Sequence, residues 1–119
     1  MMLTMYHYPA CGTCKNAQKY LKEKGVSFEE KHIVNEPPAK DELKSLVEKS
    51  GLPLQKFFNT SGKKYRELNL KEKLKDMDDD EKLSLLASDG MLIKRPIVSD
   101  GSKVTVGFKE DSFAETWVK

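Results

Sequence analysis

Two cysteines, three positions apart, are the residues of this chain best suited to chemistry. Cys11 and Cys14 lie in the segment YHYPACGTCKNA, and the chain holds no other cysteine. Such a C-x-x-C pair can carry out thiol–disulfide exchange, in which one thiolate attacks and the second thiol resolves the mixed disulfide. Pro9 and Gly12 indicate a turn around Cys11, and the residues from Cys14 onward are typical of the start of a helix.

A helix that begins here would favour the thiolate form of Cys11. Unpaired amide groups and the positive end of the helix dipole stabilise a negatively charged sulfur and lower its pKa. Lys15 adds a positive charge in the same turn. We therefore expect Cys11 to be the attacking nucleophile and Cys14 to be the resolving thiol.

A zinc site is the main alternative interpretation of the two cysteines. Together with His7 and His32 they could supply four ligands to a tetrahedral ion. However, the two histidines fall in separate predicted strands and lack the paired spacing of zinc motifs. This context favours redox chemistry without a bound metal, and it favours a packing or hydrogen-bonding role for His7 over a role as a base.

Arg95 and Pro96 are a second candidate feature, at the start of a β-rich segment. An X-Pro peptide bond at this place can be cis, and it would then present backbone to a substrate beside the thiol. Arg95 would offer a guanidinium group to an oxyanion or to the thiolate. A simple edge proline and a surface ion pair remain open alternatives on the residues alone.

The residue pattern predicts an α/β fold of the order β-α-β, helices, β-β-α. The expected strands cover residues 2–8 and 26–34, the latter parallel to the former, and a hairpin over 95–107 turns at Asp100-Gly101. The expected helices cover residues 14–24, 39–51, 80–88 and 109–119, with one helical turn at 53–58 and an ambiguous segment at 63–77. Tyr6, Phe113 and Trp117 are assigned to the core.

Without its middle, this order is the thioredoxin-like arrangement. We therefore expect one domain over residues 1–119, with residues 37–92 as a helical insertion. The composition agrees with this expectation: 119 residues, 34% charged and 38% apolar, with a formal net charge of +2. No apolar run approaches the length of a membrane span, no leader is recognised and no basic arm for nucleic acid stands out. We expect a cytoplasmic monomer.

The segments YHYPACGTCKNA, EPPAKDEL, KKYREL and KRPIV together resemble the motifs of the ArsC-type arsenate reductase family, which also includes the Spx-like and MgsR-like redox regulators. The resemblance covers nearly the whole chain. It implies a thioredoxin-like, or glutaredoxin-like, mixed sheet with an inserted helical subdomain. It also implies that Cys11 is the attacking cysteine and that Arg95 is one of three arginines that hold an oxyanion and support the thiol. We also expect the substrate to contact Gly12, Thr13, Lys15 and Pro96.

The chain departs from the arsenate reductases of this family at three places. Asn59 stands where they carry a second arginine, and no arginine stands near Gly107 and Phe108, where they carry the third. Each lost charge-assisted hydrogen bond removes about 1.5–3 kcal/mol of stabilisation from the oxyanion. Such reductases also commonly lack a cysteine at the position of Cys14, whose presence favours an intramolecular disulfide cycle.

The sequence thus favours a thiol–disulfide oxidoreductase that resembles arsenate reductase. Its expected reductant is a thiol of the glutathione and glutaredoxin, thioredoxin or bacillithiol type, so the expected partner is a redox protein or a low-molecular-weight thiol. One alternative is an Spx-like redox-sensing regulator that binds the RNA polymerase alpha subunit. A further alternative is a true arsenate reductase, which would need positive charge from lysines such as Lys15, Lys63 or Lys64.

Overall fold

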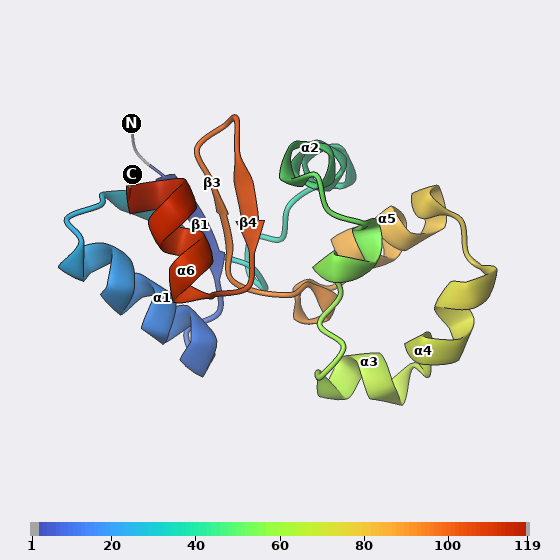
Figure 1. Cartoon of the computed structure of the whole chain (residues 1–119). Coiled ribbons are helices and arrows are strands. Elements are labelled where there is room, and N and C mark those ends of the chain that lie inside the picture. Colours follow the sequence, from blue (N-terminus) through green and yellow to red (C-terminus); the bar gives the residue numbers. More distant parts are fainter. Residues whose placement is uncertain (1–2, 119) are drawn as a thin grey trace.

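A mixed four-stranded β-sheet organises the protein, whose computed structural model describes residues 3–118 (Figure 1). Its strands are β1 (Leu3–His7), β2 (Phe28–His32), β3 (Ile97–Ser99) and β4 (Val104–Val106), and they lie in the order β2-β1-β3-β4. β1 runs parallel to β2, whereas β3 is antiparallel to both β1 and β4. The predicted β-α-β unit and the predicted hairpin are therefore confirmed, and the order of elements is that of a thioredoxin-like fold.

Six helices accompany these strands in the described part of the chain. They are α1 (Gly12–Glu23), α2 (Lys40–Ser50), α3 (Lys63–Glu67), α4 (Leu70–Lys73), α5 (Asp79–Ser88) and α6 (Glu110–Phe113). Short 3₁₀ turns occur at Leu54–Phe57, Leu74–Asp76 and Gly90–Leu92, and a π-helical turn over Ala114–Val118 continues α6. No helix within residues 3–118 is long and apolar enough to cross a membrane.

Most helix ends follow signals in the sequence. Gly25 and Gly51 adopt left-handed backbone angles (φ 72° and 68°) just after α1 and α2, as expected for glycines at helix C-termini. Asp78 caps α5 and forms a reciprocal capping box with Glu81. The first helix begins two residues earlier than predicted, at Gly12, because Cys11 itself acts as the N-cap.

The segment that was ambiguous in the sequence forms two short helices. The chain breaks at Asn69, whose positive φ of 54° is an angle that asparagine tolerates better than most residues. On either side of the break, Tyr65 and Leu70 are buried in the same hydrophobic cluster. Packing in this shared cluster, rather than helix propensity, therefore fixes the segment.

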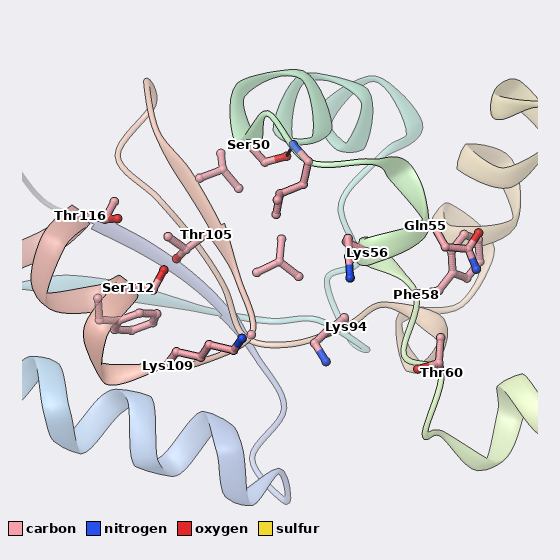
Figure 2. Close-up of a pocket in the computed structure, with 15 residues that line it drawn as sticks. Ser50, Gln55, Lys56, Phe58, Thr60, Lys94, Thr105, Lys109, Ser112 and Thr116 are labelled. Carbon is pink, nitrogen blue, oxygen red and sulfur yellow. Dashed lines mark hydrogen bonds between the residues drawn. The ribbon is translucent and has the colours of Figure 1, made fainter.

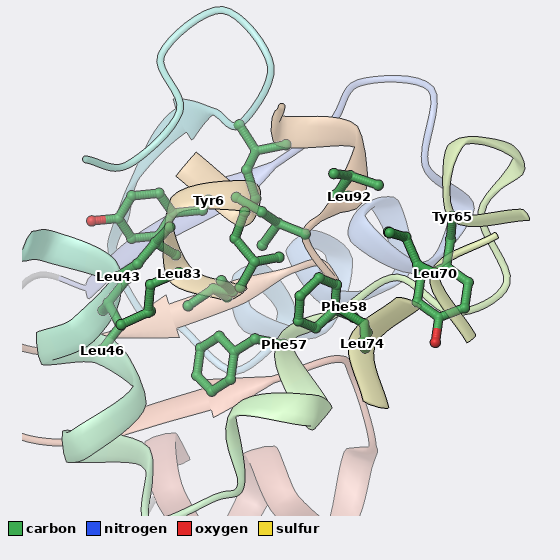
Figure 3. Close-up of a cluster of buried hydrophobic side chains, with 14 of the residues drawn as sticks. Tyr6, Leu43, Leu46, Phe57, Phe58, Tyr65, Leu70, Leu74, Leu83 and Leu92 are labelled. Carbon is green, nitrogen blue, oxygen red and sulfur yellow. The ribbon is translucent and has the colours of Figure 1, made fainter. Parts of the chain in front are cut away.

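Alternation along the strands divides the core between the two faces of the sheet. Leu3 and Met5 point to one face, where they meet residues of α1 and α6, and Tyr6 points to the other, where it meets the inserted helices. Figure 1 shows α1 and α6 on one side of the sheet and the insertion on the other, and Figure 3 shows the cluster under the insertion. Phe113 and Trp117 are buried against the sheet, as predicted.

The inserted helices return to the sheet through a close backbone contact at Gly90. Asp89 is the C-cap of α5, and Gly90 begins a 3₁₀ turn in which Gly90 itself is buried. A Cβ at Gly90 would lie 2.0 Å from the carbonyl oxygen of Ile33. The absence of a side chain thus lets the returning chain pass next to the end of β2.

Beyond this contact, the returning chain pairs with the segment after the 3₁₀ turn Leu54–Phe57. The amide of Asn59 donates to the carbonyl of Leu92 at 2.8 Å, and the amide of Lys94 donates to the carbonyl of Phe57 at 2.7 Å. A cis Arg95–Pro96 peptide bond then leads into β3. These bonds place Asn59, Lys94 and Arg95 in neighbouring backbone positions.

We predict that Gly90→Ala destabilises the protein by roughly 1–3 kcal/mol, because the added methyl group must displace backbone rather than a flexible side chain. The midpoint of urea unfolding, followed by circular dichroism, measures the change. Gly12→Ala is the matched control, since a Cβ at Gly12 meets nothing within 4 Å. Equal midpoints for the two variants would contradict the close approach at Gly90.

Candidate active site

Cys11 lies in the connection from β1 to α1, with the extended backbone of a helix cap (φ −84°, ψ 117°). Its amide donates to the carbonyl of Tyr8 at 2.9 Å, which closes the turn through Pro9. Its carbonyl accepts the amide of Lys15 at 3.1 Å, and its Sγ accepts the amide of Cys14 at 3.3 Å. The sulfur thus takes the place of the side-chain oxygen that usually caps a helix.

The surroundings of Cys11 favour its thiolate. Burial raises the pKa of the half-buried thiol, but hydrogen bonding from the thiol and amide of Cys14 and the neighbouring Arg95 guanidinium lower it, so that the net pKa lies below the ordinary value. The helix N-terminus and the arginine act together, because both place positive charge beside the sulfur. A larger fraction of Cys11 is therefore nucleophilic at neutral pH.

Cys14 behaves in the opposite way. Its side chain is 1% exposed, and burial, followed by the nearby Cys11 sulfur, raises the pKa of the Cys14 thiol to about 12. Both cysteines are free thiols in this structure. The two members of the pair are therefore chemically unequal: Cys11 is partly exposed and its pKa is lowered, whereas Cys14 is buried and its pKa is raised.

A stack of side chains holds Arg95 beside Cys11. The guanidinium carbon lies 4.9 Å from the centre of the Tyr8 ring, and the Tyr8 ring meets the His32 ring edge-on at 5.6 Å between centroids. His32 is itself fixed, because its Nδ1 accepts the amides of Val34 and Asn35 at 3.2 and 3.1 Å. Tyr8 therefore connects the end of β2 to the guanidinium through ring contacts.

Two nitrogens of Arg95 lack an acceptor. Nε and Nη1 are buried and make no hydrogen bond with any residue in the described part of the chain. Buried donors without a partner are rare in folded proteins, because each loses its hydration without replacement. Their position next to a nucleophilic sulfur suits the binding of an anionic group of a substrate.

Cys11 and Arg95 open into a cavity of about 380 Å³. Thr13 also lines it. So do Asn59, which stands where the family's reductases carry a second arginine, and Gly107 and Phe108, near which they carry the third. Of the other predicted site residues, Cys14 lies buried behind Cys11, whereas Gly12, Lys15 and Pro96 are not among the described residues that line this cavity.

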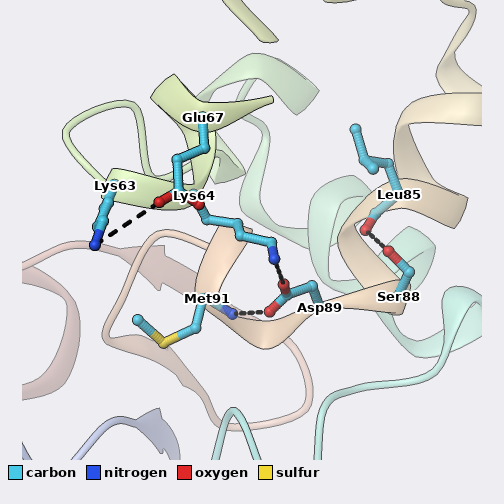
Figure 4. Close-up of polar contacts among 7 residues, drawn as sticks. All are labelled: Lys63, Lys64, Glu67, Leu85, Ser88, Asp89 and Met91. Atoms are coloured by element: carbon cyan, nitrogen blue, oxygen red, sulfur yellow. Dashed lines mark hydrogen bonds and ion pairs between the residues drawn. The ribbon is translucent and has the colours of Figure 1, made fainter. Parts of the chain in front are cut away.

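The cations that line this cavity besides Arg95 are Lys94 and Lys109, which sequence reasoning missed. The sequence instead suggested Lys63 and Lys64 as sources of positive charge. Both lie on α3, where Lys63 pairs with Glu67 and Lys64 pairs with Asp89, each at 3.8 Å (Figure 4). The sequence holds one signal for these two lysines: each is adjacent to a residue at or near an arginine position of the family. Lys94 immediately precedes Arg95, and Lys109 follows Phe108.

The two histidines have structural partners. His7 Nε2 lies 3.3 Å from Glu30 Oε2, and His7 Nδ1 lies 3.4 Å from Gln18 Nε2. The Nδ1 of His32 is occupied by backbone amides, as described above. Within residues 3–118, no three His, Cys, Asp or Glu side chains are grouped as ligands for a metal ion.

Comparison with known proteins agrees with this arrangement. The model of the ArsC family matches residues 6–116. The chain belongs to the ArsC family. The uncharacterized protein YusI of Bacillus subtilis (strain 168) is 68% identical to this chain, over 98% of the chain and 99% of that protein. The regulatory protein MgsR of the same strain is 31% identical, over 89% of this chain and 82% of its own length.

Solved structures show the same fold. A protein from Bacteroides fragilis, described as related to the ArsC family, superposes with a TM-score of 0.93 at 43% sequence identity, over 97% of each chain. The family and the thioredoxin-like fold that the sequence motifs suggested are therefore both confirmed.

In this ArsC family protein, we predict that Arg95→Leu raises the pKa of Cys11, because the thiolate loses a nearby cation. The pH dependence of Cys11 alkylation by iodoacetamide, followed by mass spectrometry, reports this pKa. Lys19→Gln is the control, since Lys19 is exposed on α1 and does not line the cavity. The role of Arg95 would be disproved if both variants titrate like the unchanged protein.

A second prediction concerns Tyr8. Tyr8→Leu removes the ring under the guanidinium and is expected to raise the pKa of Cys11 in the same direction as Arg95→Leu, by a smaller amount. Tyr8→Phe keeps the ring and should leave the pKa of Cys11 near its original value. The same alkylation profiles measure both variants, and a shift of equal size in Tyr8→Phe would show that the hydroxyl, not the ring, matters.

Proposed function

We propose that this ArsC family protein is a thiol–disulfide oxidoreductase in which Cys11 attacks and Cys14 resolves. The observation that carries the proposal is the opposite perturbation of the two thiols: the pKa of the cavity-lining Cys11 is lowered, whereas that of the buried Cys14 is raised to about 12. Groups whose pKa values are pushed apart by their surroundings are typical of sites that give two similar residues different tasks.

The first step is an exchange at sulfur. The Cys11 thiolate attacks one sulfur of a substrate disulfide, a new bond forms between Cys11 and that sulfur, and the substrate's second sulfur leaves as a thiolate. In this step the negative charge passes from the Cys11 sulfur to the leaving sulfur of the substrate. The two unpaired donors of Arg95 can bind that leaving sulfur or an anionic group of the substrate.

The second step depends on the loss of charge from Cys11. The negative sulfur of Cys11 is one cause of the raised pKa of Cys14, and this contribution disappears once Cys11 is part of a mixed disulfide. Cys14 then loses its proton more readily and attacks Cys11 Sγ. The Cys11–Cys14 disulfide forms, and the substrate leaves as a thiolate. The substrate thus gains two electrons, which the protein supplies.

A thiol reductant must return these two electrons. The proposed donor is glutathione with glutaredoxin, thioredoxin or a bacillithiol-type thiol, and the partner is accordingly a redox protein or a low-molecular-weight thiol. The protein is proposed to act as a monomer, as one domain with its helical insertion, in the cytoplasm. The substrate side of the cavity is formed by Cys11, Thr13 and Arg95, with Gly12, Lys15 and Pro96 close by in the sequence.

Arsenate reduction is a second candidate function, and one observation favours it. Lys94 and Lys109 line the cavity with Arg95, so some positive charge is present although two arginines of the family's reductases, one at the position of Asn59 and one near Gly107 and Phe108, are missing. Lysines, however, are poorer bidentate partners for an oxyanion than arginines. Disulfide exchange requires less charge at the site and is therefore the better supported reaction.

A regulatory function is a third candidate, favoured by the similarity to MgsR, a protein named as regulatory. The same two thiols would then report the redox state of their surroundings, and the protein would bind the RNA polymerase alpha subunit in one of the two states. The cavity beside Cys11 supports catalysis more directly, because a sensor does not require room for a substrate at the sulfur.

The test uses reduced protein and glutathione disulfide, with intact mass measured over time. We expect the unchanged protein to form the Cys11–Cys14 disulfide, Cys14→Ser to accumulate a mixed disulfide with glutathione on Cys11, and Cys11→Ser to remain reduced. Thr13→Ser serves as the control for a small change in the cavity wall that leaves both thiols in place.

Oxidation of Cys11→Ser at the rate of the unchanged protein would overturn the proposed roles. Parallel experiments test the two other candidate functions. Turnover of arsenate with glutathione and glutaredoxin would favour arsenate reduction. Capture of the RNA polymerase alpha subunit by one redox form of the protein, without disulfide turnover, would favour the regulatory function.

A further inference from the structure

A second and larger cavity, of about 650 Å³, adjoins the one beside Cys11 (Figure 2). Four residues line both cavities: Lys94, Val106, Gly107 and Lys109. The larger cavity continues from them between β4 and α6 on one side and the end of α2 with the following 3₁₀ turn on the other. The two cavities together form a groove that leads from Cys11 along β4, and we call it the β4 groove.

The β4 groove is positively charged. The charged residues that line its two cavities are Lys56, Lys94, Arg95 and Lys109, and no Asp or Glu of the described residues lines either one. The three lysines form no ion pair within residues 3–118. The chain as a whole has 21 basic and 19 acidic residues, so this separation of charge is local and does not follow from composition.

The groove also offers main-chain hydrogen-bonding groups. The ladder between β3 and β4 includes the bonds from the Asp100 amide to the Lys103 carbonyl and from the Gly107 amide to the Pro96 carbonyl. By the alternation of an antiparallel pair, Val104 and Val106 turn their N–H and C=O groups away from β3. β4 is the edge strand, and no hydrogen bond among the described residues uses these groups.

An occupant that contacts both ends of the groove must be extended. Cys11 lines the smaller cavity and Lys56 lines the larger one, and neither residue lines both. Between them lie residues 104–107, that is, β4 and Gly107. Their extended backbone is about 10 Å long. A small disulfide at Cys11 fills the first cavity, whereas a polypeptide segment of about four residues reaches the second.

We propose that the β4 groove binds an extended, acidic segment of a protein whose disulfide Cys11 attacks; the inference rests on the proposed function and specifies its substrate class. Carboxylates of the segment lie near Lys94, Lys109 and Lys56, in that order away from the thiol. The main chain of the segment lies near the unpaired edge groups of Val106, which is partly exposed, whereas Val104 is buried. Leu52, which is 39% exposed, offers an apolar contact in the larger cavity.

Binding is tested without chemistry by a labelled peptide in which serine replaces the reactive cysteine and Asp and Glu follow it. Its counterpart carries Asn and Gln instead. Fluorescence anisotropy should show that the acidic peptide binds about tenfold more tightly than the amide peptide, and that added salt removes the difference. Lys56→Gln should weaken binding of the acidic peptide about two- to fivefold. Equal affinity for the two peptides would overturn the proposal.

Lys44→Gln is the matched control, since it removes the same charge from an exposed position on α2 that lines neither cavity. Lys44→Gln should leave the affinity for the acidic peptide unchanged. An equal loss in Lys44→Gln and Lys56→Gln would show that the net charge of the protein, not the groove, attracts the peptide, and would also overturn the proposal.

Reaction rates separate this inference from the proposed function. Reduced protein is mixed with glutathione disulfide or with the cysteine forms of the two peptides as mixed disulfides. Lys56→Gln should slow reaction with the acidic peptide about two- to fivefold and leave the rate with glutathione disulfide unchanged. Equal rates for the two peptides, with normal reaction of glutathione disulfide, would refute the groove and leave the redox function intact. Lys56-dependent binding without any reaction would support the groove and refute the redox function.

Discussion

The chemistry of this protein depends on a balance of opposing effects at the sulfur of Cys11. Burial works against a charged sulfur, and the pKa of Cys11 nevertheless lies below its ordinary value because the Cys14 thiol and amide and the Arg95 guanidinium outweigh that penalty. Some of these donors are neighbours of Cys11 in the sequence and one is distant. The amide is given by the local geometry of the helix cap, whereas the guanidinium belongs to a residue more than 80 positions away in the chain.

The rest of the fold brings these distant groups together. One hydrophobic cluster fixes α1, and with it the amides at its start, against one face of the sheet. The other cluster fixes the inserted helices against the opposite face and returns the chain past Gly90 to Arg95. The Tyr8 ring then sets the guanidinium beside the thiol. Rigid elements therefore determine the environment of a group that lies in a loop.

Charge at the site is arranged locally in a protein whose overall charge is close to zero. The formal net charge is +2, yet the described charged residues along the cavities beside Cys11 and β4 are all cations. Arg95 lowers the pKa of Cys11, and in the proposed function the lysines farther along attract anionic groups of a substrate. Lysines suit the second task, because they act as mobile point charges and do not require the fixed bidentate geometry of arginine–oxyanion contacts.

The sequence by itself determined what depends on neighbours along the chain. The C-x-x-C pair next to a helix start, the parallel β-α-β unit, the hairpin around Asp100 and the capped start of α5 all follow from local spacing and turn chemistry. Only the tertiary structure decided which distant side chains meet. Lys94 and Lys109, rather than Lys63 and Lys64, line the cavity beside Cys11. Residues 63–77 form two helices that are separated at Asn69, and Gly90 makes a close backbone contact with Ile33. The physical reason is that these outcomes depend on contacts between the inserted helices, the sheet and the returning chain, and such contacts leave no periodic pattern in the sequence.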